Sequence, residues 1–183
     1  LVKGINVSIV LKNLGRESTA FGFVGGFTGD ALKESLKQQG ISTDFITVQE
    51  GFTRINVKMK SDDETEINGQ GPRITNDNIN ELYSKLDALN EDDILVISGS
   101  IPSTLPSDMY ENIMSRLDGK NIRIIVDATR NLLVNVLKYH PFLIKPNNIE
   151  LGEIFDVELK TREEVIPYAK KLQELGARNV LVS

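Results

Sequence analysis

The chain of 183 residues contains no cysteine, no tryptophan and a single histidine. Without cysteine it can form no disulfide, no thiolate nucleophile and no cysteine-bound zinc site. The single histidine, His140, has no second histidine with which to share a metal, and its place before Pro141 is typical of a turn residue rather than of a general base. A net charge of −5 disfavours non-specific binding to nucleic acid, because phosphates attract positively charged surfaces.

Long apolar runs are missing as well. No run approaches the ~20 residues that a membrane-spanning helix needs, and no apolar segment follows a positively charged start. The lack of cysteine fits a reducing compartment. We therefore expect a cytoplasmic protein that binds neither membrane nor nucleic acid. The sequence does not begin with Met and ends in an apolar run before Ser183, so we expect both ends to lie inside a longer protein.

Helical and strand patterns alternate along the second half of the chain. Apolar residues at helical spacing predict helices over residues 75–89, 107–117, 131–138, 148–155 and 161–175. Between the earlier ones lie short apolar runs, which predict strands over residues 93–98, 122–126 and 142–144. This order predicts βαβ units around a parallel sheet, and the continuous apolar strands predict a sheet covered on both faces.

The first half begins with a predicted helix over residues 4–14, whose apolar face carries Val7, Val10, Leu11 and Leu14. A strand (18–24), a helix (28–39) and a short strand (45–48) follow. Residues 53–60 then alternate Ile55, Val57 and Met59 with polar side chains, which is typical of a half-buried strand. A polar turn at 61–64 and a second strand at 65–68 complete a hairpin, which we expect to project from the domain.

Polar residues follow three consecutive predicted strands of the second half. Parallel strands bring their carboxyl ends to one sheet edge, which is where open α/β sheets bind ligands. In the third segment Asn147 is placed to cap the next helix, and Glu150 has the spacing of a capping box, so a plain capped turn is the alternative. Asn147 and Glu150 are also suited to orient the waters around Mg²⁺. The three segments are Ser98–Gly99–Ser100, Asp127–Ala128–Thr129, and Lys145–Pro146–Asn147 with Glu150.

Two segments of the first half carry groups that suit an anionic ligand. Gly4 and Asn6 open a helix, where free backbone amides favour anions, although a plain helix start explains them equally well. Arg54 lies on the polar face of the hairpin, and its planar fork suits a phosphate, although most such arginines are only solvated. No Walker A motif and no G-x-G-x-x-G motif occurs.

Seven sequence blocks, taken in order, resemble the PfkB branch of the ribokinase-like sugar kinases. The resemblance covers essentially the whole chain and implies a three-layer α/β/α sandwich with a mainly parallel sheet. Residues 1–183 would be a partial kinase domain, with a small β lid at about 52–72. The blocks are K-G-I-N-V-S-x-V-L-K-N-L-G (3–15), G-F-V-G-G-F-T-G-D (22–30), T-R-I-N-V-K (53–58), E-T-E-I-N-G-x-G-P (64–72), S-G-S-I-P (98–102), V-D-A-T (126–129) and I-K-P-N-x-x-E (144–150).

The resemblance implies ATP-dependent phosphorylation of a ketohexose phosphate, with Mg²⁺. Fructose 1-phosphate, giving fructose 1,6-bisphosphate, is the preferred substrate, because the third and fourth blocks are most similar to that subgroup. It also implies a homodimer formed through the lid. The substrate-binding residues would be Gly4, Asn6, Arg54, Gly99 and Ser100, and those for nucleotide and Mg²⁺ would be Asp127, Lys145, Asn147 and Glu150, with Glu150 acting on the metal through water.

The chain departs from the family pattern at two points. Leu1-Val2 stands where the family usually has Gly-Gly, and the G-A-G-D motif with the general-base aspartate is absent. The resemblance puts that motif beyond Ser183 and thus implies that these residues alone are inactive. A tagatose-6-phosphate kinase is the first alternative and a fructose-6-phosphate kinase the next, while a non-catalytic sugar-phosphate-binding relative of the same fold is the alternative from another class.

Overall fold

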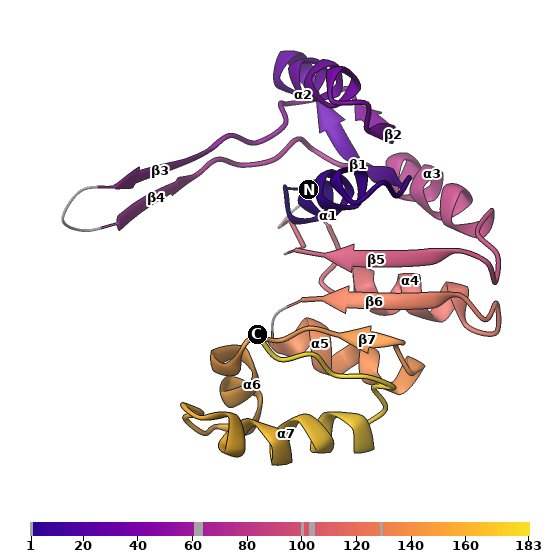
Figure 1. Cartoon of the computed structure of the whole chain (residues 1–183). Coiled ribbons are helices and arrows are strands. Elements are labelled where there is room, and N and C mark those ends of the chain that lie inside the picture. The colour runs from indigo at the N-terminus through magenta and orange to yellow at the C-terminus, as the bar shows by residue number, and fades with distance from the viewer. Residues whose placement is uncertain (1, 61–63, 100, 103–104, 129) are drawn as a thin grey trace. The chain divides into compact units, whose positions relative to one another are not determined.

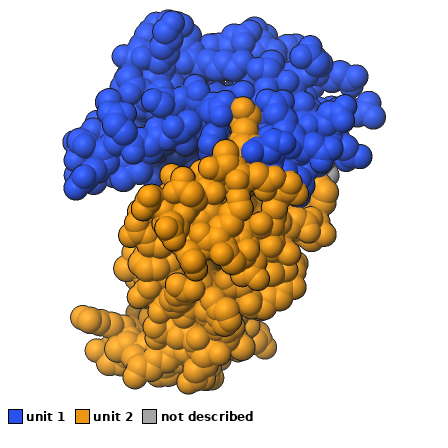
Figure 2. Space-filling view, turned by 90° about the vertical axis from the view of Figure 1, so that its right-hand side faces the viewer, with its two compact units in different colours: residues 1–84, 102–105 blue, residues 85–101, 106–183 orange. Residues whose placement is uncertain are grey.

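The structure is a computed structural model that describes residues 2–60, 64–99, 101–102, 105–128 and 130–183. It divides into two compact units, coloured separately in Figure 2. Unit 1 comprises residues 1–84 and 102–105, and unit 2 comprises residues 85–101 and 106–183. The predicted site residue Ser100 and most of the predicted turn at 61–64 lie outside the described residues.

Unit 1 combines a parallel strand pair, an antiparallel hairpin and helices (Figure 1). Strands β1 and β2 pair in parallel, and β3 and β4 pair antiparallel, as the alternation of residues 53–60 predicts. Its elements are α1 (Val2–Asn13), β1 (Thr19–Gly25), α2 (Gly26–Gln38), β2 (Ser42–Val48), β3 (Asn56–Lys60), β4 (Glu64–Asn68) and most of α3 (Asn76–Asp87).

A hydrophobic cluster joins α1, α2 and β2. Ile5, Leu36 and Ile41 are buried in it, and Ile9 packs against them. The predicted apolar face of α1 is therefore wrong in part: Val7 and Leu11 are half-buried, whereas Val10 and Leu14 are 55% and 71% exposed. Helical spacing alone fits both faces of this helix, and the contact with α2 selects the face that carries Ile5.

The hairpin β3–β4 exposes its apolar side chains. Val57 stands opposite Ile67 in the register, and these residues are 46% and 55% exposed. Ile55 and Met59, which alternate with Val57, are 60% and 50% exposed. The hairpin is confirmed and extends away from α2 in Figure 1, but the expected half-burial is wrong for the single chain, because nothing in the described part of unit 1 covers this face.

Unit 2 is built on the parallel sheet β5-β6-β7. Helices α4 and α5 contact each other, as do α5 and α6, and α6 and α7. The parallel sheet and its connecting helices agree with the βαβ organisation predicted for this half. The elements are β5 (Ile94–Ser98), α4 (Met109–Leu117), β6 (Arg123–Asp127), α5 (Arg130–Val136), the 3₁₀ helix η1 (Leu137–Tyr139), β7 (Leu143–Ile144), α6 (Asn148–Phe155) and α7 (Arg162–Glu174).

The sheet of unit 2 is less deeply buried than its apolar sequence predicts. Ile94 of β5 is 53% exposed, whereas Val126 of β6 and Ile144 of β7 are fully buried. The last described residues run parallel to β7: the Ile144 amide donates to the Asn179 carbonyl at 3.1 Å, and the Leu181 amide donates to the Ile144 carbonyl at 3.0 Å. In the described part of the chain, no helix combines the length and apolar character needed to cross a membrane.

Candidate functional site

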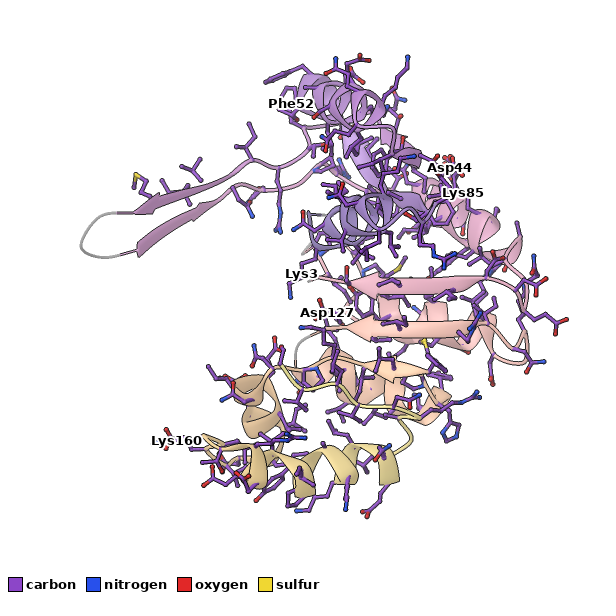
Figure 3. All side chains as sticks on the ribbon, in the orientation of Figure 1. Lys3, Asp44, Phe52, Lys85, Asp127 and Lys160 are labelled. Atoms are coloured by element: carbon purple, nitrogen blue, oxygen red, sulfur yellow. The ribbon has the colours of Figure 1, made fainter. Side chains whose placement is uncertain are left out.

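The parallel register of unit 2 brings the predicted polar segments to one edge of the sheet. Ser98, the last residue of β5, is paired with Asp127, the last residue of β6. Val126 is paired with Ile144 of β7, so Lys145 follows β7 at the same level. Figure 3 shows Asp127 at the end of the β6 arrow. Polar groups that are far apart in the sequence thus become neighbours through backbone pairing alone.

Gly99 forms a fixed turn directly after β5. Its φ of +101° is a conformation that favours glycine, and a Cβ there would meet no atom of a described residue within 4 Å. Its amide donates to the Asp127 carbonyl at 3.1 Å, and its carbonyl accepts a hydrogen bond from the Tyr110 hydroxyl at 2.9 Å. The turn is therefore tied both to β6 and to α4.

Tyr110 stabilises this turn through its hydrogen bond to the Gly99 carbonyl. Its side chain is buried, with the residue 7% exposed. Burial, together with the negative charge of Asp127, raises the pKa of Tyr110 to about 12. The phenol therefore stays neutral around pH 7 and remains a hydrogen-bond donor to Gly99.

Ser98 carries a polar atom that lacks a partner in the described structure. Its hydroxyl oxygen is buried and makes no hydrogen bond to any described residue. Burying a hydroxyl without a partner costs about 1–3 kcal/mol, so such groups are rare and often belong to binding sites. Its place, next to Gly99 and opposite Asp127, makes Ser98 part of the same sheet edge.

Lys145 is held at the backbone and at its ammonium group. Its amide donates to the Val126 carbonyl at 3.1 Å, and Nζ donates to the Ser183 hydroxyl at 3.1 Å. The next residue, Pro146, is fully buried and ends the strand. This leaves a half-buried cation at the carboxyl end of β7.

Asn147 and Glu150 form the predicted capping box at the start of α6. The Asn147 Oδ1 accepts a hydrogen bond from the Glu150 amide at 2.7 Å, and the Glu150 Oε2 accepts one from the Asn147 amide at 2.9 Å. The capping prediction is confirmed. The side-chain nitrogen of Asn147, Nδ2, and the Glu150 Oε1 take no part in the cap. Both side chains therefore retain a polar group for a ligand.

The donor set at this edge fits a magnesium ion that is held mainly through water and phosphate. Among the described residues, no three His, Cys, Asp or Glu side chains gather closely enough to bind a metal by themselves. Mg²⁺ commonly binds through one or two carboxylates, several waters and substrate phosphates, and Glu150 and Asp127 supply carboxylates here. Lys145 adds a cation suited to a nucleotide phosphate.

The remaining predicted residues belong to unit 1. Gly4 and Asn6 lie in α1, where Gly4 is half-buried and Asn6 is exposed. Arg54 is exposed and stands two residues before β3, at the root of the hairpin. The ligand-binding roles of Gly4, Asn6, Arg54, Gly99, Ser100, Asp127, Lys145, Asn147 and Glu150 stay predictions.

The sequence does not indicate the role of Tyr110 at the unit 2 edge, and it indicates that of Ser98 only in part. Tyr110 lies on a helix eleven residues after Gly99, and no spacing rule indicates that its hydroxyl reaches that carbonyl. Ser98 is one of the polar strand ends predicted to form a ligand site, and only the structure shows that its buried oxygen has no partner among the described residues. In both cases the signal lies in tertiary packing.

Comparison with known proteins gives a consistent result. The model of the family described as pfkB family carbohydrate kinase matches residues 3–183. The chain is 48% identical, over 99% of its length, to the 1-phosphofructokinase of Bacillus subtilis, covering 59% of that protein. It is 40% identical, over 99% of its length, to the D-tagatose-1-phosphate kinase of Bacillus licheniformis, covering 60% of that protein. The chain thus spans about three fifths of the curated relatives it matches.

Solved structures agree with these sequence relatives. Phosphofructokinase-2 from Escherichia coli, in complex with fructose-6-phosphate, superposes with a TM-score of 0.86 at 26% identity, over 98% of this chain and 61% of that one. This similarity confirms the ribokinase-like α/β fold that the sequence predicts.

The capping box generates a stability prediction. Asn147→Ala removes the side-chain oxygen that accepts from the Glu150 amide, and we expect the free energy of unfolding to fall by about 1 kcal/mol. Asn147→Ser keeps an equally good cap, so its unfolding free energy should stay within a few tenths of a kcal/mol of wild type. Urea unfolding followed by circular dichroism measures both. Equal losses in the two variants would contradict a capping role.

Proposed function

The chain belongs to the pfkB family of carbohydrate kinases, and on this basis we propose that it takes part in phosphoryl transfer from ATP to a ketohexose phosphate. The proposed substrate is fructose 1-phosphate, which would become fructose 1,6-bisphosphate. The observation that carries this choice is the 48% identity to a 1-phosphofructokinase across nearly the whole chain. Because ATP and sugar phosphates are found in the cytosol, that compartment is part of the proposal.

Unit 2 would bind the nucleotide and its metal. Lys145 would pair with a phosphate oxygen, while Asn147 and Glu150 would orient the waters of Mg²⁺ with the groups that the capping box leaves available. Bound Mg²⁺ supplies charge neutralisation on the transferring phosphoryl group. Asp127 lies at the same edge and would complete the polar surroundings. Positioning and electrostatics, rather than covalent chemistry, are what such a reaction requires of the protein.

In unit 1, the residues proposed for the sugar phosphate are Gly4, Asn6 and Arg54. Gly4 and Asn6 would contact sugar hydroxyls, and Arg54 would bind the substrate phosphate through its planar fork. In unit 2, Gly99 and Ser100 are the residues proposed for the sugar substrate. Among the described residues, none lies within 4 Å of a Cβ built on Gly99 and none bonds the Ser98 hydroxyl, which supports a ligand at this strand end. The hairpin would act as a lid that excludes water from the reaction.

A second substrate is favoured by one specific observation. The 40% identity to a D-tagatose-1-phosphate kinase makes tagatose 1-phosphate the next candidate, because both sugars would present a 1-phosphate to Arg54. Tagatose 6-phosphate and fructose 6-phosphate place the phosphate at the other end of the sugar. A single misplaced phosphate contact is enough to separate these substrates.

A substrate panel tests the proposal. Purified full-length protein is assayed for ADP release with fructose 1-phosphate, tagatose 1-phosphate, tagatose 6-phosphate and fructose 6-phosphate, with Mg²⁺ and ATP in excess. We expect the highest kcat/KM with fructose 1-phosphate and no turnover by the 183-residue segment alone. Binding of sugar phosphate without any transfer would instead support the non-catalytic alternative, and turnover by the segment would contradict its predicted inactivity.

Substitutions of Arg54 and Asn147 should affect different substrates, the sugar phosphate and ATP respectively. Arg54→Ala removes a charged hydrogen-bonding group from the sugar-phosphate site, and we expect KM for fructose 1-phosphate to rise at least tenfold with little change in KM for ATP. Asn147→Ser keeps the helix cap and should raise KM for ATP instead. Arg16→Ala is a matched control on an exposed residue of unit 1. Equal effects of Arg54→Ala on both substrates would contradict its role.

We further propose that the exposed apolar face of the hairpin is covered by a second copy of the chain. Ile55, Val57, Met59 and Ile67 expose 46–60% of their surface on a projecting two-stranded sheet. Such a sheet is at best marginally stable by itself, and burial against an identical hairpin would stabilise both.

Val57→Asp should therefore weaken the dimer. A charge at the centre of the buried face is costly, so we expect sedimentation equilibrium to shift from dimer to monomer at micromolar concentration. Ile94→Asp, at an exposed isoleucine outside the hairpin, is the control and should leave the dimer intact. A wild-type protein that sediments as a monomer would refute the interface.

A further inference from the structure

Thr53, the residue immediately before Arg54, is bound to the start of α2 by three hydrogen bonds. Its amide donates to the Gly25 carbonyl at 2.9 Å, and its hydroxyl accepts from the Gly25 amide at 3.0 Å. Its carbonyl accepts from the Thr28 hydroxyl at 2.8 Å. Both backbone polar groups of Thr53 and its side-chain oxygen are thus engaged with a single helix start. We call this set of contacts the hairpin clasp.

Glycines of the G-F-V-G-G-F-T-G-D block allow the clasp to form. A Cβ at Gly29 would lie 3.1 Å from the Thr53 hydroxyl oxygen, tighter than an ordinary contact. Gly26 has a φ of +58°, and a Cβ there would overlap the ring of Phe52. Gly26 and Gly29, which carry no side chain, therefore leave room for residues 52–53 to approach the start of α2. This explains a block that none of the proposed ligand contacts uses.

Two further contacts support the hairpin root. The rings of Phe27 and Phe52 meet edge to face with centroids 5.4 Å apart, and Figure 3 shows Phe52 beside α2. In the segment that follows β4, the Arg73 amide donates to the Glu50 carbonyl at 3.0 Å. Beyond these contacts the apolar residues of the hairpin are exposed, so the direction in which it leaves the unit is set at its root.

Arg54 is the first residue after the clasp. Its guanidinium stands at the end of a long, flexible side chain, so its reach depends on where its backbone is held. A displacement of about 1 Å can cost up to 100-fold in rate when a group must meet a reacting ligand. A backbone anchored by three hydrogen bonds on the preceding residue limits such displacement.

We propose that Thr53 and Thr28 are positioning residues that hold Arg54 in the direction needed to bind the phosphate of the sugar substrate. This rests on the role of Arg54 given under the proposed function. The clasp acts through Arg54 and makes no contact with the substrate itself. A clasp with a merely structural role would change the stability of the protein, but it would not affect KM for the sugar phosphate more than KM for ATP.

The test begins with the Thr53 hydroxyl in the full-length protein. Thr53→Val removes this oxygen and keeps the branched shape, while Thr53→Ser restores the oxygen. With fructose 1-phosphate we expect Thr53→Val to raise KM about 3- to 10-fold, with KM for ATP within about twofold of wild type. Thr53→Ser should return KM to within about twofold. Thr47→Val, at an exposed threonine of β2, makes the same chemical change and should alter neither value.

A double-mutant cycle shows whether the effect passes through Arg54. In the Arg54→Ala background, Thr53→Val should add less than about twofold to KM for fructose 1-phosphate, because the group that it positions is gone. Independent, multiplying effects would overturn the proposal. An equal rise of KM for ATP would overturn it as well, since that would indicate a general structural role.

Hydrogen exchange tests whether the Thr53 hydroxyl holds the hairpin root, and it does so without an activity measurement. Peptides spanning residues 50–60 should exchange faster in Thr53→Val than in wild type or Thr47→Val, because the root opens more often. Unchanged exchange overturns the clasp. If the wild-type protein transfers phosphate to none of the four sugars, the proposed function fails, and exchange alone then decides whether the hydroxyl holds the hairpin root.

Discussion

Parallel pairing of β5, β6 and β7 is the constraint on which the candidate site of unit 2 depends. The register Ser98–Asp127 and Val126–Ile144 makes the strands end level with one another. A slip by one residue would turn alternate side chains to the opposite face and separate these groups. The buried Val126 and Ile144 oppose such a slip, because their side chains would leave the core. Core packing therefore fixes the positions of the polar residues that follow the strands.

At the edge so formed, the same side chains serve structure and the proposed chemistry. The side chains of Asn147 and Glu150 each accept a hydrogen bond from the other residue's backbone amide. The Asn147 Nδ2 and the Glu150 Oε1 stay outside the cap. Capping fixes both rotamers before a ligand arrives, which lowers the entropy lost on binding. Tyr110 likewise holds the Gly99 carbonyl through a hydrogen bond from its hydroxyl. The edge is thus preorganised by contacts that belong to the fold.

The features predicted correctly from sequence are those decided locally. The cap at Asn147 depends on residues three apart, and the hairpin depends on alternation within sixteen residues, so each can be predicted without knowledge of the fold. The buried face of α1 depends on Leu36 and Ile41, which lie in other elements, and the spacing of Val10 and Leu14 could not reveal that. The hydrogen-bond partners of the Tyr110 and Thr53 side chains are equally non-local.

The hairpin root shows how a sequence block gains a physical meaning from such a non-local contact. By its letters, G-F-V-G-G-F-T-G-D supports a family resemblance and suggests a turn. In the structure its glycines leave room for residues 52–53, and its threonine, Thr28, closes the clasp on the Thr53 carbonyl. Two sequence blocks separated by more than twenty residues, 22–30 and 53–58, are thus joined by hydrogen bonds next to Arg54. Because Thr53 and Arg54 are covalent neighbours, the contacts that hold Thr53 also limit the backbone displacement of Arg54. The Arg54 side chain therefore extends from a fixed backbone position at the hairpin root.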